Sequence, residues 1–142
     1  MSIQAIDVLY TAVATAENGR DGRVATDDGK LDVVVNPPKE LGGSGAGTNP
    51  EQLFAAGYSA CFQGALGVVA RQEKADISGS TVTAEVGLGR TEADGFGLEV
   101  RITASIPNVD AATAQALVEK AHQVCPYSNA TRGNIKVEVA AA

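Results

Sequence analysis

Polar and apolar residues alternate along three short segments in the first third of the chain, a pattern typical of β-strands. Turn-forming residues rich in Asn, Asp and Gly separate the segments, which favours tight reversals between them. The three segments are residues 6–16, 22–26 and 31–36, joined by NGRDG and DDG. The pattern therefore predicts that the chain opens with a three-stranded meander.

The longest apolar stretch follows a link rich in Gly and Pro, residues 37–48, and predicts a helix ending near Gln72. Asn49 can cap this helix, Pro50 suits its first turn, and Glu51 favours the positive end of the helix dipole. The helix is apolar nearly all round and rich in Ala and Gly. We therefore expect it to be the buried central element of the core.

The second half of the chain returns to strand patterns and adds one more helix. Residues 80–89 and 96–106 alternate with period two around a short turn, which predicts a hairpin. Residues 110–124 have helical spacing, Pro126 stops that helix, and residues 134–140 predict a last strand. The expected fold class is α+β, with antiparallel hairpins and a meander packed around a long buried helix and a second helix.

The length and net charge of the chain disfavour several classes of function. A chain of 142 residues fits one domain, 1–142, and a net charge of −6 disfavours nucleic acid or an anionic membrane as a partner. Polar residues interrupt the apolar segment 53–70, which argues against a membrane span. The N-terminus has no signal-peptide pattern, so a cytoplasmic location is expected.

The two cysteines are the residues most able to carry chemistry. Cys61 lies in the middle of the predicted central helix, and Cys125 lies directly before Pro126. They could be small core residues, a disulfide, a redox pair, or a zinc site with His122, although zinc would then lack a fourth ligand. Composition alone leaves these alternatives open.

A reactive Cys61 would need a cation beside it, because an apolar setting raises the pKa of a thiol. Arg20 and Arg132 lie next to glycines on predicted loops and could fold over the helix. Glu51 precedes Cys61 by ten residues, so the two share a helix face roughly 15 Å apart, a gap that an arginine could bridge. Glu51 could equally be a plain helix-start carboxylate.

Two long motifs bring these residues together in a known pattern. The segments GGSGAGTNPEQLFAAGYSACFQGAL and AHQVCPYSNATRGNI resemble the two signature segments of the organic hydroperoxide resistance proteins, a branch of the OsmC-like superfamily. The leading segment YTAVATAENGRDGR resembles that family's first strand and turn. The resemblance covers about residues 8–139 and implies an OsmC-like fold that forms an intertwined homodimer.

The resemblance also implies a role for each matching residue. Cys61, in SACF, would be the peroxidatic thiol, and Cys125, in VCPYS, the resolving thiol. Arg20, in GRDG, would activate the Cys61 thiolate, and Glu51, in TNPEQ, would orient Arg20.

The implied activity is a cofactor-free thiol peroxidase that reduces organic hydroperoxides and protects against oxidative stress. An apolar mouth with Phe54, Phe96 and aliphatic side chains would favour alkyl or fatty-acid hydroperoxides. Its implied reductant is a dithiol such as a lipoylated protein, and the alternative function is a hydroperoxide-reactive sensor or carrier without turnover.

Overall fold

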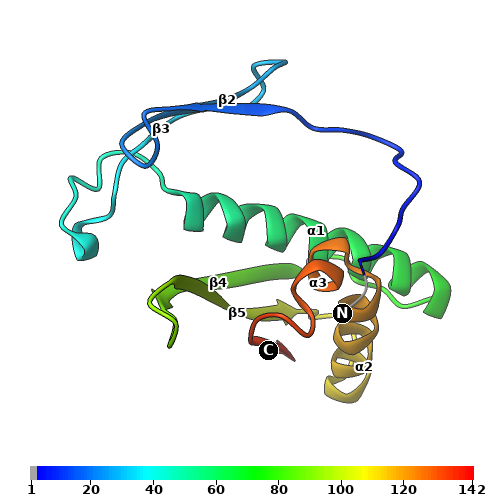
Figure 1. The fold of residues 1–142 in the computed structure, drawn as a ribbon. Helices are drawn as coiled ribbons and strands as arrows, with labels where there is room; N and C mark the ends of the chain where they lie inside the picture. Colours follow the sequence, from blue (N-terminus) through cyan, green and yellow to red (C-terminus); the bar gives the residue numbers. More distant parts are fainter. Residues whose placement is uncertain (1–2) are drawn as a thin grey trace. The chain divides into compact units, whose positions relative to one another are not determined.

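The computed structural model describes residues 3–142, which divide into two compact units, Met1–Pro50 and Glu51–Ala142 (Figure 1). Each unit is considered by itself below. The expectation of a single domain over 1–142 stays a prediction.

The first unit contains the expected meander. Strands β1 (Ala14–Glu17), β2 (Gly22–Thr26) and β3 (Asp32–Val35) pair in that order, and both pairings are antiparallel. The link after β3 contains a short 3-10 helix, η1 (Lys39–Leu41), and returns to bridge Val35 through Thr48.

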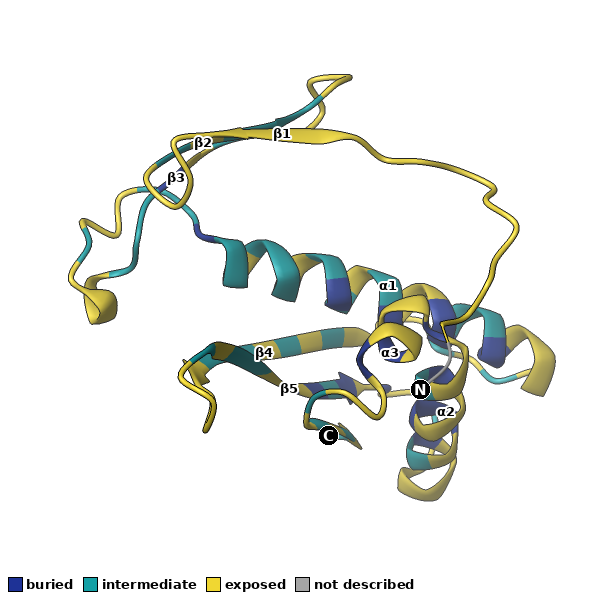
Figure 2. Ribbon diagram, in the orientation of Figure 1, coloured by how far each residue is buried: buried dark blue, intermediate teal, exposed yellow. Residues whose placement is uncertain are grey.

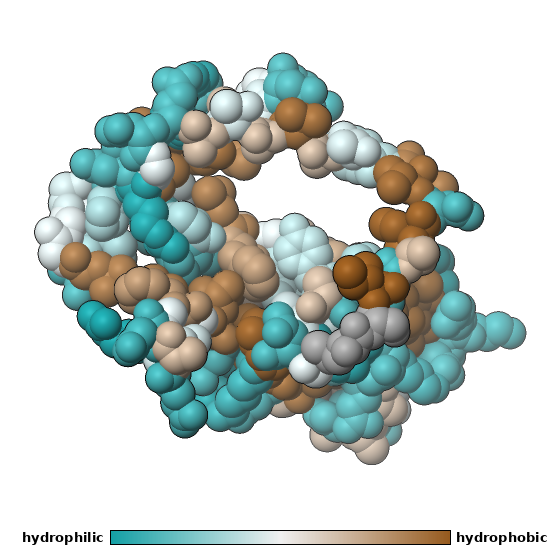
Figure 3. Space-filling model, in the orientation of Figure 1, coloured by the Kyte–Doolittle hydropathy of each residue, from teal (hydrophilic) through white to brown (hydrophobic). Residues whose placement is uncertain are grey.

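The first strand is shorter than the pattern predicts. Residues 6–16 are expected to be extended and paired, but β1 begins only at Ala14, and residues 3–13 belong to no helix or strand. The reason is the lack of a partner, because β2 ends at Thr26, whose register partner is Ala14. The segment before β1 therefore leaves its apolar side chains on the surface (Figure 3), with Leu9 98% and Tyr10 81% exposed.

The helices of the second unit begin where the sequence pattern places them. Helix α1 (Pro50–Glu73) starts at the expected proline, and α2 (Ala111–Val124) is capped by Asp110, whose carboxylate accepts from the Thr113 backbone N–H at 2.7 Å. A further helix, α3 (Pro126–Thr131), is not expected from the pattern. Pro126 does stop α2, as predicted, but it also supplies the first residue of α3, a position that suits proline.

The sheet of the second unit has the strand order β4-β5-β6. Strands β4 (Thr81–Arg90) and β5 (Phe96–Ser105) form the predicted antiparallel hairpin. Strand β6 (Val137–Ala141) pairs with β5 in parallel, whereas the sequence predicts only antiparallel pairing. A parallel neighbour requires a crossover connection, and α2 with α3 provides it between β5 and β6.

The core of the second unit lies between one face of this sheet and the helices. Figure 2 shows the buried positions of α1 and α2, and these side chains form one cluster with those of β5. Phe62, Leu66, Ile102 and Val118 are among its fully buried members. By length and composition alone, α1 could also cross a membrane, a test that the core helix of a soluble protein passes as well. Six of its 24 residues are buried in this unit, so its packing there accounts for part of its apolar character.

Candidate active site at the cysteine pair

The structure brings the two cysteines together. Cys61 on α1 and Cys125 between α2 and α3 are 64 positions apart in sequence, yet their Sγ atoms lie 3.6 Å apart, and both are free thiols. A disulfide bond requires about 2.05 Å, so a small movement would join them. Their exposure differs, because Cys125 is fully buried whereas Cys61 is only partly buried. A reagent from solution would therefore meet Cys61 first.

Proline chemistry explains the position of Cys125. A residue that precedes proline avoids the helical conformation, and Cys125 is accordingly extended, with φ −60° and ψ 124°. Its N–H donates to the Ala121 carbonyl at 2.8 Å, and its carbonyl accepts from the Asn129 N–H at 2.9 Å. Cys125 thus ends one helix and begins the next, and its backbone is held on both sides.

Three aromatic rings pack together in the part of the fold that carries the pair. Phe54 and Tyr58 of α1 contact each other at 6.0 Å between ring centroids, and Tyr127 contacts them at 6.1 and 5.7 Å. Gly57 allows Tyr127 to approach α1 this closely, since a Cβ at that position would lie 2.9 Å from the Tyr127 hydroxyl oxygen. Gly57 precedes Cys61 by about one helical turn, so the ring packs on the face of α1 that also carries the thiol.

An apolar cavity of about 590 Å³ adjoins these rings. Its lining includes Phe54, Tyr127, Leu98 and Ile135. Phe54 is expected at an apolar mouth, and it does line the cavity. Phe96, expected there too, is 72% exposed and lies under the Arg90 guanidinium, 5.7 Å from its ring centroid.

The surroundings act on the Cys61 thiol in opposite directions. Burial raises its pKa, a hydrogen bond from the Tyr127 backbone N–H lowers it, and the neighbouring Cys125 raises it again. That N–H belongs to the first turn of α3, where donors have no partner within the helix. The net direction is upward, so a positive charge is needed to populate the thiolate near neutral pH.

A chain of hydrogen bonds lies beneath the pair. The Tyr58 hydroxyl of α1 is 2.8 Å from Ser128 Oγ and 3.1 Å from Thr131 Oγ1, both on α3. His122 Nδ1 of α2 is 2.7 Å from the same Ser128 oxygen. Sequence reasoning does not single out Tyr58 or Ser128, although a tyrosine inside an apolar helix is a signal that a buried polar partner exists.

The expected activating residues occupy different units. Glu51 lies in the first turn of α1, ahead of Cys61 on the same helix, as the spacing predicts. Arg20 lies in the turn between β1 and β2, directly after Asn18 and Gly19, which both have positive φ. Arg132, the other candidate cation, donates from Nη2 to the His122 carbonyl at 2.5 Å.

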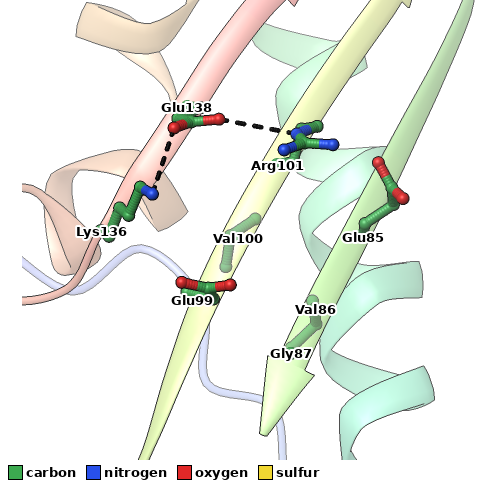
Figure 4. A pocket seen from close by; sticks show the side chains of 8 residues that line it. All are labelled: Glu85, Val86, Gly87, Glu99, Val100, Arg101, Lys136 and Glu138. Carbon is green, nitrogen blue, oxygen red and sulfur yellow. Dashed lines mark ion pairs between the residues drawn. The ribbon is translucent and has the colours of Figure 1, made fainter. Parts of the chain in front are cut away.

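A second, polar depression of about 260 Å³ lies on the outer face of the sheet (Figure 4). Glu138 pairs there with Arg101 at 3.5 Å and with Lys136 at 3.3 Å. No cysteine lines it. Over residues 3–142, no group of three His, Cys, Asp or Glu side chains could hold a metal ion.

Comparisons with known proteins identify the family. The family model described as OsmC-like protein matches residues 42–140. An organic hydroperoxide resistance protein from Xanthomonas axonopodis pv. citri is 54% identical, with 95% of this chain and 96% of the relative covered. The chain belongs to the OsmC-like family, in its organic hydroperoxide resistance branch.

Solved structures of this branch share the fold. An organic hydroperoxide resistance protein from Elizabethkingia anophelis superposes with a TM-score of 0.91 at 54% identity, covering 96% of this chain and 99% of the other. OhrB of Bacillus subtilis superposes with a TM-score of 0.87 at 43% identity, covering 95% and 100%. These matches confirm the α+β fold and the resemblance drawn from the motifs.

The buried chain of hydrogen bonds predicts a pH dependence of stability. Burial, with a further contribution from the positive Arg132, lowers the pKa of His122 below its usual 6.5. In the window below pH 6.5 the unfolded chain takes up a proton that the folded chain does not, so the free energy of unfolding falls as the pH falls. Urea unfolding between pH 7 and pH 5 measures this slope.

His122→Asn tests the source of this slope. His122 is the only histidine in the sequence, and no other type of side chain ordinarily titrates near pH 6.5. The variant is expected to flatten the slope, whatever its absolute stability. An unchanged slope would show that His122 does not carry the effect.

Proposed function

We propose that this protein is a cysteine-based thiol peroxidase that reduces organic hydroperoxides to alcohols and so protects against oxidative stress. The observation that carries the proposal is the pair of free thiols 3.6 Å apart, one partly accessible and one buried, beside an apolar cavity. Relatives across the length of the chain are named for organic hydroperoxide resistance, which agrees with this chemistry.

The proposed reaction begins at Cys61, the peroxidatic thiol. Its thiolate attacks the terminal oxygen of ROOH, the O–O bond breaks, and the alkoxide leaves as an alcohol after taking a proton. Cys61 is then a sulfenic acid, the first stage of cysteine oxidation. The thiol of Cys125, the resolving residue, next attacks Cys61 sulfur, so that an S–S bond forms, the S–O bond breaks, and hydroxide leaves with the thiol proton as water.

A dithiol reductant would complete the cycle. Thiol–disulfide exchange opens the Cys61–Cys125 bond through a mixed disulfide, and the second thiol of the reductant releases the protein. The buried position of Cys125 favours attack on the more accessible Cys61 sulfur. A lipoyl group on a carrier protein has two thiols on a slender apolar arm, which suits the partly covered Cys61.

Arg20 is the proposed source of the positive charge that Cys61 needs, and Glu51 is proposed to orient its guanidinium. A cation beside a buried thiol favours the thiolate, and a carboxylate can hold the planar guanidinium through two hydrogen bonds. The need for such a charge follows from the upward net shift in the pKa of Cys61.

The apolar cavity is proposed to select the substrate. Its lining of rings and aliphatic side chains would bury an alkyl chain and place its terminal peroxide near Cys61. Hydrogen peroxide has no apolar part to bind there. Alkyl or fatty-acid hydroperoxides are therefore the proposed substrates, and the cytoplasm is the proposed location.

Peroxide treatment of the reduced protein tests the mechanism. One equivalent of an alkyl hydroperoxide is expected to lower the intact mass by about 2 Da, which a dithiol reverses over repeated cycles. Cys61→Ser is expected to abolish turnover. Cys125→Ser is expected to gain about 16 Da in mass as the sulfenic acid forms and then to react no further, or to over-oxidise.

Near-normal turnover by Cys61→Ser would overturn the mechanism. Oxidation of the wild type without recycling by the dithiol would instead favour the sensor or carrier.

The role of Arg20 has its own test. In a Cys125→Ser background, Arg20→Ala is expected to raise the pKa of Cys61 by about one to two units, measured as thiolate absorbance during a pH titration. Arg23→Ala is the matched control, because Arg23 lies three residues away, is exposed, and is bound to Asp32 at 2.7 Å. Equal titrations for both variants would remove Arg20 from the mechanism.

A homodimer is proposed from the surface of the first unit. Its segment before β1 exposes apolar side chains that a second copy could cover, among them Ile6, Leu9 and Tyr10. Light scattering is expected to give about twice the chain mass of 14.4 kDa, and a combined Leu9→Ser and Tyr10→Ser variant should shift the protein toward single chains. A single-chain mass for the wild type at micromolar concentration would contradict the dimer.

A further inference from the structure

We infer that the buried hydrogen bonds among Tyr58, Ser128 and His122 position Cys125 for the second step of the reaction, disulfide formation. This inference rests on the proposed function, because it assumes that Cys61 and Cys125 react in sequence. It gives Ser128 and its two partners a role outside the reacting atoms, as positioning residues.

Two pairs of residues face each other where α3 meets α1. Tyr58 and Cys61 are three residues apart on α1 and so share a helix face. Cys125 and Ser128 are also three residues apart, at the start of α3. In the first pair, the hydroxyl oxygens of Tyr58 and Ser128 are hydrogen-bonded at 2.8 Å. In the second pair, the sulfurs of Cys61 and Cys125 are 3.6 Å apart. The hydrogen bond thus fixes which residues face each other where α3 meets α1.

This hydrogen bond is one of the few contacts that hold α3 in place. The helix has only six residues, too few to be stable without tertiary contacts. Its two buried residues, Ser128 and Thr131, are both polar, and both lie within hydrogen-bonding distance of the Tyr58 hydroxyl. Apart from the half-exposed Tyr127 ring, α3 is therefore anchored by hydrogen bonds where most helices are anchored by apolar side chains.

Ser128 belongs to α3, and its Oγ atom contacts residues of both other helices of this unit. Its Oγ contacts Tyr58 of α1 at 2.8 Å and His122 of α2 at 2.7 Å, while its backbone belongs to α3. A hydroxyl has one proton to donate and can also accept, so it can satisfy both partners at once. In the part of the chain that the structure describes, every buried side-chain nitrogen and oxygen has a hydrogen-bond partner. Removal of this hydroxyl would take this partner from His122 Nδ1 and leave the Tyr58 hydroxyl with its longer contact to Thr131 Oγ1, at 3.1 Å.

Precise placement matters most for the second step. Once Cys61 is a sulfenic acid, Cys125 must reach its sulfur before another hydroperoxide oxidises Cys61 to the irreversible sulfinic acid. The first step needs an accessible Cys61 thiolate, for which Arg20 is the proposed cation, and it forms no bond to Cys125. Loosening α3 should therefore slow disulfide formation more than sulfenic acid formation, which depends on α3 only through the hydrogen bond from the Tyr127 N–H to the Cys61 thiol.

Ser128→Ala tests the inference through this separation of steps. Rapid quenching with a sulfenic acid trap, followed by intact mass, gives the two rates in one experiment. The expected result is a first rate that changes little and disulfide formation about tenfold slower or more, because misplacement of a reacting group by about 1 Å can slow a reaction about a hundredfold. Over-oxidised protein should also appear at lower hydroperoxide concentrations.

Two further variants separate positioning from general stability. His122→Asn keeps a polar side-chain nitrogen near the place of Nδ1 and is expected to slow disulfide formation less than His122→Ala. Ser78→Ala serves as the control, because Ser78 lies in the loop before β4, away from the cysteines in sequence and outside the contacts described above. It is expected to leave both rates unchanged.

The possible results test the positioning role and the proposed peroxidase function separately. Equal disulfide rates in wild type and Ser128→Ala would overturn the positioning role while leaving the peroxidase intact, and so would equal slowing of both steps. A wild type that forms no sulfenic acid and no disulfide would instead overturn the proposed function.

Discussion

The corner at Cys125 is the constraint on which the candidate site depends. Pro126 prevents Cys125 from continuing α2, so the chain turns there and starts α3 in a new direction. The turn places a thiol of the second half of the chain 3.6 Å from a thiol of the central helix. Without it, α2 would continue past this point and residues 126–131 would lie elsewhere.

Burial gives this site both its protection and its main chemical difficulty. Partial burial limits the access of solutes to the Cys61 thiol, but it also raises the pKa of that thiol and leaves it mostly protonated. The Tyr127 backbone N–H offsets only part of this effect. The chemistry therefore calls for a cation at the edge of the site, where its charge can reach the sulfur and still be solvated.

Much of the fold could be predicted from local pattern, because hairpins, caps and prolines act over a few residues. The meander, the β4–β5 hairpin and the start of α1 at Pro50 all follow from such signals. The parallel pairing of β6 and the loss of strand before Ala14 could not be read in this way, since each depends on which distant segment is available as a partner. The same holds within the site, where the sequence singles out Cys61 and Cys125, but only the fold reveals that Tyr58 meets Ser128.

Gly57 has a consequence for attempts to engineer this protein. Replacing a helical glycine by alanine is a common way to raise thermal stability, because alanine restricts the unfolded chain and favours the helix. Gly64, in the same helix, has open space where the alanine methyl would lie and is suited to that strategy. At Gly57 the added methyl would push against the ring of Tyr127, the residue whose backbone N–H donates to the Cys61 thiol. Gly57→Ala would thus favour the helix but displace Tyr127 near the thiol, so a gain in stability would be accompanied by a loss of activity.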